Sequence, residues 1–427
     1  MLFGSVALIV GATLLPFGAM EAAQIPPAWC LRCGDLWLAD VISNVALFVP
    51  LGMALSLRGV HWPRVLLLSL GFSVFVETMQ YLGLPPGRSP AVADLLTNTL
   101  GGGLGALLVR AALAEWSRTA QRNTQHAVLL ASAWSVGAVL LFVLTGVALQ
   151  PPAPAANAPA FALETSPFKH VPKHGWYEGL TDSAVVNGAR IRRGWSGPII
   201  SQVTRPALPL QAAVWVRSTD PLWGQIPLLF LHLPNDSSAW LQLAKQGNSA
   251  ELSVYRRAWG WGLRVPSLRV PNAFAGRTIG DMSTLGVYAQ VSATTLQLRT
   301  VNSAAPASGY GDSAARGDSV SLALTPLLGW ALIQPVVGVQ SPLAWAAQCG
   351  WLLALLFPVG WFSARAPRPV AVLAGAGGVV LLTLALLPRA MPVHALAPWE
   401  WAQLLVALAL GHVAAMLARR YQVLRAA

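Results

Sequence analysis

Long apolar segments constrain this chain more than any other feature of its sequence. A transmembrane helix needs about 20 predominantly apolar residues, and eight segments come close to that length or reach it. The chain is 55% hydrophobic and only 10% charged, whereas soluble domains carry roughly 25% charged residues. A wholly soluble protein and a disordered one are therefore excluded, and the predicted fold class is a polytopic α-helical membrane protein. Its helices are expected at Leu2–Met20, Val41–Leu57, Val65–Leu82, Val92–Leu113, Ala127–Leu149, Leu343–Phe362, Val370–Leu387 and Trp399–Leu417.

Arginines in the connecting loops predict the orientation of these helices. The first segment has no Lys or Arg ahead of it, so a retained helix is expected rather than a cleaved signal peptide. Short loops on the other side of an eight-helix arrangement carry only Arg32, Arg88 and Arg389. Because cytoplasmic loops are the ones enriched in Lys and Arg, both termini are predicted to be cytoplasmic and residues 150–342 extracytoplasmic. The arginines on the predicted cytoplasmic side are Arg58, Arg64, Arg110, Arg118, Arg122, Arg365, Arg368, Arg419, Arg420 and Arg425.

The net charge of +12 has the same explanation. The basic residues are spread along the chain beside apolar segments, where they mostly set topology. No nucleic-acid partner is therefore expected.

The segment between the fifth and sixth helices has a different character. A Pro/Ala linker at 150–160 is expected to be extended, and after it short runs alternate apolar with polar residues between Pro, Gly, Asn and Asp. Such a pattern indicates an antiparallel sandwich or barrel at 161–341. The division predicted is a five-helix domain at 1–149, the linker, this β domain, and a three-helix domain at 342–427. The strand-like runs are residues 208–218, 226–234, 239–245, 250–257 and 284–301.

The β segment resembles a concanavalin-A-like jelly roll of the laminin-G or pentraxin kind. The piece Gly194-Trp-Ser-Gly-Pro-Ile-Ile-Ser201 is similar to an early strand of such domains, and the Trp-bearing run Ala213-Val-Trp-Val216 follows it. The resemblance covers about residues 160–335 and implies an inserted all-β jelly-roll sandwich. Such domains often bind glycans through aromatic side chains. Trp223, Trp240, Trp259 and Trp261 are candidates, unless they fill the core or face the membrane.

Polar residues inside helices two to four are the strongest functional signal, because ionisable groups within a membrane are costly. Helix two carries Asp40 and Asn44 four residues apart, so both lie on one face. The predicted topology places every strong polar group of these helices in one layer at the outer interface. That layer holds Asp40 and Asn44, then Ser73, Glu77 and Gln80 at the end of helix three, Arg88 and Ser89 in the loop, and Asp94 and Asn98 at the start of helix four.

The arrangement N-x-x-x-F-x-P-x-G, S-x-x-x-E-x-x-Q, G-R-S and D-x-x-x-N-x-x-G resembles the VanZ family over about residues 36–109. The family pattern maps onto Asn44, Phe48, Pro50, Gly52, Ser73, Glu77, Gln80, Arg88, Ser89, Asp94, Asn98 and Gly101. The resemblance implies a bacterial cytoplasmic-membrane protein of the cell envelope. Its name-giving member is linked to teicoplanin resistance, and the family has no settled reaction. The inserted β segment and the C-terminal helices depart from the short family form.

Three functions are compatible with this sequence, two of which use the polar layer. The layer binds the headgroup of a membrane lipid or lipid-linked envelope component, with Arg88 holding a phosphate. Alternatively, Glu77 and Asp94 act as acid and base of a membrane enzyme, or the chain is a scaffold whose β domain binds a glycan or an envelope protein. The layer's amides and hydroxyls also serve simple helix packing.

No metal or cofactor is expected, because no Ser/His pair, HExxH motif or metal-ligand spacing accompanies these acids. Cys30 and Cys33 form a single CLRC, for which a local disulfide and two free thiols both remain open.

Overall fold

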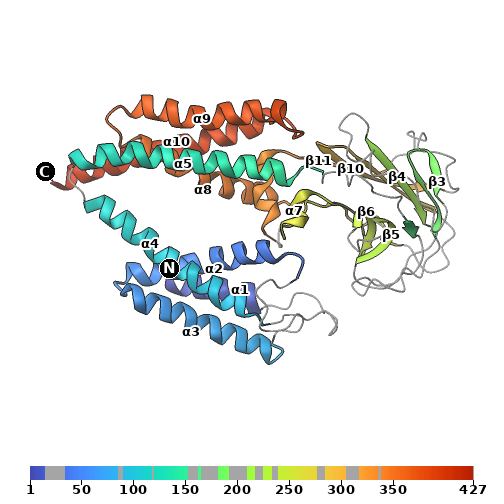
Figure 1. Ribbon diagram of the computed structural model, residues 1–427, viewed down its shortest axis with the longest axis horizontal. Coiled ribbons are helices and arrows are strands. Elements are labelled where there is room, and N and C mark those ends of the chain that lie inside the picture. Colours follow the sequence, from blue (N-terminus) through green and yellow to red (C-terminus); the bar gives the residue numbers. More distant parts are fainter. Residues whose placement is uncertain are drawn as a thin grey trace. The chain divides into compact units, whose positions relative to one another are not determined.

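The computed structural model comprises two compact units (Figure 1). The first unit comprises Met1–Leu130, Trp261–Arg264 and Arg365–Pro369; the second comprises Ala131–Gly260, Val265–Ala364 and Val370–Ala427. The structure describes residues 1–14, 34–84, 90–117, 120–151, 162–164, 181–191, 209–216, 225–232, 239–276, 284–303, 317–334 and 338–426.

The first unit is helical. Its core is built from one face of each helix, with Ile9, Phe48, Val65 and Ala106 among the buried residues. Pro63 stands in the first turn of α3, where its missing N–H costs no helical bond. The helices are α1 (Leu2–Leu14), α2 (Trp37–Leu57), α3 (Trp62–Tyr81), α4 (Val92–Ser117) and the first part of α5 (Ala120–Ala148).

Glycines let α2 and α4 approach until their backbones touch. A side chain at Gly52 would collide with the carbonyl group of Gly102, and one at Gly101 or Gly105 would collide with the backbone of α2. Small residues that permit such contact are typical of membrane helix pairs. Gly52 and Gly101 of the family pattern therefore have a packing role.

The second unit contains a four-helix group in which α5, α8, α9 and α10 lie side by side (Figure 1). The shared core includes Phe142 of α5, Leu356 of α8, Leu384 of α9 and Leu404 of α10. Gly360 and Gly411 bring α8 and α10 together, because a side chain at either position would strike the opposite backbone. The bounds are α8 (Ala344–Ser363), α9 (Pro369–Ala390) and α10 (Pro398–Ala426).

Two antiparallel sheets complete the second unit. The five-stranded sheet has the order β1-β5-β6-β7-β8 and the six-stranded sheet the order β11-β10-β9-β4-β2-β3. Contacts between β7 or β8 and β10 join the sheets. The strands are β1 (Ala162–Glu164), β2 (Thr181–Val186), β3 (Ala189–Ile191), β4 (Leu210–Val216), β5 (Gln225–His232), β6 (Ala239–Gln246), β7 (Ser249–Val254), β8 (Leu268–Val270), β9 (Thr284–Val291), β10 (Thr295–Ser303) and β11 (Ser319–Ala323).

Alternation along the strands separates a buried face from a solvated one. Val287 and Ala289 of β9 are buried, as are Leu296 and Leu298 of β10, whereas the residues between them are more exposed. A short helix, α7 (Arg257–Gly260), follows β7. The buried 3-10 helix η2 (Pro326–Leu332) follows β11 shortly before α8.

The predicted fold class is confirmed: within the described residues, seven helices are long and apolar enough to span a membrane, and antiparallel sheets form a separate region. The first expected span contains the 13-residue α1, and its remaining residues, 15–20, lie outside the described ones. Strands occur in each of the five runs proposed from the sequence. The short strands β1, β2, β3, β8 and β11 were not anticipated.

The division into domains stays a prediction. The structure adds that the later part of α5 packs in one core with the C-terminal helices. The Gly194–Ser201 piece, Trp223 and the Cys30/Cys33 pair lie outside the described residues.

Candidate functional site

Three helices of the first unit meet in the predicted polar layer. Asn44, on the second turn of α2, donates from Nδ2 to Oδ1 of Asp94 in the first turn of α4, at 2.7 Å. Both side chains are half-buried. The first polar bond of the layer therefore joins α2 to α4 where a carboxylate is charge-stabilised by the helix N-terminus.

A second set of bonds joins α3 to α4 one turn deeper. Asn98 donates from Nδ2 to the Ser73 hydroxyl at 2.9 Å, and that hydroxyl lies 3.5 Å from the Asp94 carbonyl oxygen. Ser73 and Asn98 are both buried. Asn98 Oδ1 is also buried and has no hydrogen-bond partner among the described residues.

Glu77 fixes the start of α4. Its Oε2 accepts a hydrogen bond from the backbone N–H of Ala91 at 2.8 Å, immediately before the helix begins at Val92. The amides of a helix N-terminus lack helical partners and carry partial positive charge, so a carboxylate is favoured there. Gln80, one turn later in α3, approaches the carbonyl oxygen of Thr13 in α1 at 3.4 Å.

The structure thus brings together six of the eight residues proposed for the site. Asn44, Ser73, Asp94 and Asn98 form a connected group, while Glu77 and Gln80 bond the backbone beside it. Arg88 and Ser89 lie outside the described residues.

A loop far away in the sequence completes the rim of this layer, which the sequence did not reveal. The carbonyl oxygen of Gly262 accepts from the N–H groups of Leu38 and Ala39 at 3.1 and 3.0 Å, and so caps α2. Arg264 Nη2 pairs with Asp40 Oδ1 at 3.2 Å, and the Asp40 side chain is half exposed. The sequence indicated Asp40 as a member of the layer but did not indicate Arg264 as its partner.

Gly262 has to be a glycine at this cap. Its φ is +73°, and a Cβ would lie 2.5 Å from the Trp37 ring. Any larger residue would displace the carbonyl group that caps α2.

The chemistry available to the layer is hydrogen bonding and charge. Within the described part of the chain, no group of three or more His, Cys, Asp or Glu residues could hold a metal ion. Glu77 and Asp94 are both engaged, with the Ala91 amide and with Asn44. The arrangement favours holding a fixed polar surface over transferring protons.

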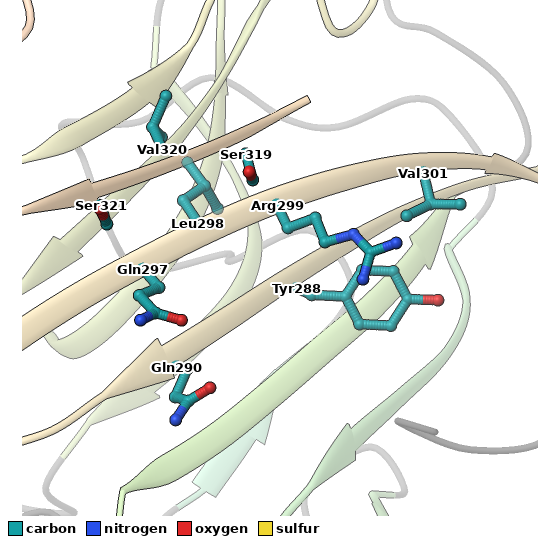
Figure 2. Close-up of a pocket in the computed structure, with 9 residues that line it drawn as sticks. All are labelled: Tyr288, Gln290, Gln297, Leu298, Arg299, Val301, Ser319, Val320 and Ser321. Carbon is teal, nitrogen blue, oxygen red and sulfur yellow. The ribbon is translucent and has the colours of Figure 1, made fainter. Parts of the chain in front are cut away.

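The six-stranded sheet carries a second candidate on its solvated face. Two polar rows cross β9, β10 and β11: Ser321, Gln297 and Gln290 are paired in register, and so are Ser319, Arg299 and Tyr288. These side chains line a groove of about 400 Å³. Figure 2 shows the Arg299 guanidinium beside the Tyr288 ring.

Comparison with known proteins agrees with the geometry of the first unit. Residues 5–114 match the model of the VanZ/LLP1 family. They span every described residue of the polar layer except the capping loop. No curated protein and no solved structure gave a match. The chain is a multi-pass helical membrane protein whose N-terminal part is VanZ-like.

Proposed function

We propose that this chain is a non-catalytic accessory factor of the bacterial cell envelope, and that its polar layer binds the headgroup of a lipid-linked envelope component. The protein lies in the cytoplasmic membrane with both termini in the cytoplasm and residues 150–342 outside. The proposal rests on one observation: polar side chains from three spans are bonded together at one end of the first unit.

The burial of these residues supports a binding surface with a rigid backing. Ser73, Glu77 and Asn98 are buried, so they hold the three helices in one arrangement. Asn44 and Asp94 are half-buried, and the exposed Asp40 with Arg264 lies on the rim. A headgroup with hydroxyl or amide donors matches the carboxylates of Asp94 and Asp40.

A phosphate on such a headgroup needs a cation. Arg88 lies three residues before Ala91 in the sequence. The backbone amide of Ala91 is held by Glu77. Arginine recognises phosphate by paired N–H bonds, so Arg88 is assigned this role and Ser89 a supporting hydrogen bond.

Lipids retained by the full-length protein in mild detergent test the proposal. Mass spectrometry is expected to find polyprenyl-phosphate-linked species on the wild type. Arg88→Ala should lose them without lowering the melting temperature. Arg58→Ala is the matched control, since Arg58 is an exposed arginine at the opposite end of α2.

The opposite result has a clear signature. If Arg88→Ala lowers stability and retention together, and adding Asp94→Asn restores both, Arg88 only neutralises a buried carboxylate. The layer would then be a structural staple.

Topology is tested separately. A reporter fused after Ala427 should report a cytoplasmic C-terminus, and protease added from outside should cut the linker at 150–160. Cleavage of that linker only from the cytoplasmic side would reverse the orientation.

Glycan binding by the β domain is a second candidate, because the groove of Figure 2 combines an aromatic ring with amide, hydroxyl and guanidinium groups. A concanavalin-A-like sandwich would supply this kind of surface. The full-length protein on a glycan array should bind, and Tyr288→Ala with Gln290→Ala should remove the signal. Binding that survives both changes would place any glycan elsewhere.

A further inference from the structure

A cavity in the second unit lies where α8 and α10 begin, and we call it the α8–α10 cavity. Its volume is about 430 Å³, within the roughly 300–1,000 Å³ usual for small-molecule sites. Its walls come from β11, η2, the first turns of α8 and α10, and the connection between α9 and α10. Because α8 and α10 are long and apolar enough to cross a membrane, their beginnings are expected at a membrane boundary.

The charged side chains that line the cavity argue against an anionic ligand. Glu400 lines the cavity, and no Lys or Arg is among the described residues that do. A phosphate or carboxylate ligand would therefore meet a carboxylate with no Lys or Arg to offset it, and the other ionisable side chain among the described lining residues is that of His394. An anionic headgroup is disfavoured, in contrast to the layer of the first unit.

The position of Glu400 is fixed by two hydrogen bonds. Its Oε1 accepts from the Thr325 hydroxyl at 3.1 Å and its Oε2 from the backbone N–H of Ala397 at 2.8 Å. The second bond is one half of a helix capping box. A carboxylate offers about four lone-pair sites, so Glu400 keeps the capacity to accept from a ligand.

The indole N–H of Trp330 needs a hydrogen-bond acceptor, whereas Glu400 can still accept from a donor. Trp330 lines the cavity and is 5% exposed, and its Nε1 has no hydrogen-bond partner among the described residues. A buried donor without a partner costs free energy until an acceptor arrives. An ammonium group offers donors for Glu400 but no acceptor for Trp330, whereas a hydroxyl group is donor and acceptor at once.

Two more tryptophans present apolar surface at the same place. Trp345 and Trp399 line the cavity and remain 66% and 54% exposed. Both stand in the first turns of α8 and α10, the depth at which tryptophans gather in membrane proteins. Flat aromatic surface beside hydroxyl-matching groups suits a ring that is apolar on its C–H faces and polar at its edge.

We infer that the α8–α10 cavity binds the neutral saccharide ring of a membrane glycolipid, with Trp330 donating to a ring hydroxyl and Glu400 accepting from one. This site is separate from the polar layer of the proposed function and from the groove of Figure 2.

Lipid retention on the full-length protein tests the inference. The protein is placed in nanodiscs with equal amounts of monoglucosyl-diacylglycerol, phosphatidylethanolamine and phosphatidylglycerol, then analysed by native mass spectrometry. The glucosyl lipid should be retained preferentially. Trp330→Phe keeps the apolar ring and removes the N–H, and it should lower that preference roughly fivefold to tenfold, the effect of losing one hydrogen bond.

Two further variants identify the cavity. Glu400→Gln keeps an acceptor for the Ala397 amide and should weaken glucolipid retention while the protein still folds. Asn248→Ala, at an exposed amide in the turn between β6 and β7, should leave it unchanged. Retention that falls with Gln290→Ala, in the groove of Figure 2, but not with the cavity variants would overturn the inference and leave the polar layer untouched.

Other outcomes are equally decisive. Preference for phosphatidylethanolamine would show an ammonium site, and preference for phosphatidylglycerol an anion site; either would overturn the inference. Adding free glucose distinguishes the source of the ring. No displacement supports a lipid-borne saccharide, and full displacement at millimolar glucose would show that a soluble saccharide suffices.

Discussion

The two groups of membrane helices pack in the same way but differ in the polar groups that lie between their spans. In the first unit α2 and α4 touch through Gly52, Gly101 and Gly105, and in the second α8 and α10 touch through Gly360 and Gly411. Close backbone contact is therefore common to both. Polar side chains also join spans in both units, but the connected set of described residues contains a carboxylate, Asp94, in the first unit and only amides and a thiol, from Gln348, Gln403 and Cys349, in the second.

The second group shows that a carboxylate between the spans is not needed for packing. Its core of α5, α8, α9 and α10 is apolar, and its described polar contacts include Gln348 with Gln403 and Glu400 with the start of α10. Carboxylates inside a membrane are costly, so Asp94 calls for an explanation beyond helix association. This difference is the physical argument for a function of the first unit.

The largest effect is expected when the close glycine contacts, which both groups of helices share, are blocked. Gly105→Leu and Gly411→Leu each place a side chain against the backbone of the facing helix, so overpacking should cost well above about 3 kcal/mol. Size-exclusion chromatography should show no folded monodisperse protein. Gly71→Leu and Gly378→Leu are the controls, because a Cβ at either position meets nothing within 4 Å. Tolerance of the first pair would show that the glycine contacts are not required.

A smaller effect is expected when the carboxylate that accepts a backbone N–H at a helix start is removed from either unit. Glu77→Ala and Glu400→Ala each leave a backbone N–H at a helix start without its partner, at Ala91 and Ala397. Each should lower the unfolding free energy by about 1–3 kcal/mol, and Glu77→Gln by less, because an amide oxygen still accepts. Unfolding by denaturant in mixed micelles measures this. A Glu77→Gln variant as unstable as Glu77→Ala would mean that its charge, not its shape, holds α4.

The side-chain pairs should couple more weakly still. Double-mutant cycles on Asn44 with Asp94, and on Gln348 with Gln403, are expected to give about 0.6 kcal/mol each, the usual value between membrane helices. The same unfolding assay applies. Coupling several times larger for Asn44 with Asp94 would turn the layer into a stability device and weaken the case for function.

The smallest effect concerns the rim. Arg264→Ala removes an ion pair with a half-exposed carboxylate, and such pairs contribute about 0–1 kcal/mol. The melting temperature should hardly move, and the remaining change should vanish in high salt. A shift that persists at high salt would show that Arg264 contributes through packing.

The sequence predicted what depends on local composition. Apolar length located the seven long helices, and alternation located strands β4 to β7, β9 and β10. The predicted topology placed Asn44, Ser73, Asp94 and Asn98 in one layer, and the four-residue spacing of Asp94 and Asn98 put those two on one helix face. These signals are confined to a few turns of chain.

Contacts between distant segments had no such signal. Nothing near Gly262 indicates that its carbonyl group caps α2, because a cap needs only a free carbonyl oxygen in the right place. Nothing in α5 indicates that Phe142 packs with the C-terminal helices, since its apolar face would suit any neighbour. The α8–α10 cavity is equally hidden, because Trp330 and Glu400 are 70 residues apart.

The Gly262 cap also imposes an order on biosynthesis. Arg264 follows its partner Asp40 by 224 residues, so a ribosome adding roughly 5–20 residues per second reaches the cap about 10 to 45 s after α2 has emerged. During that interval the first amide groups of α2 do not yet have the Gly262 carbonyl oxygen as their acceptor. The first unit is thus among the earliest parts to be made and among the last to be finished, and a chain that stops before Trp261 would leave it open.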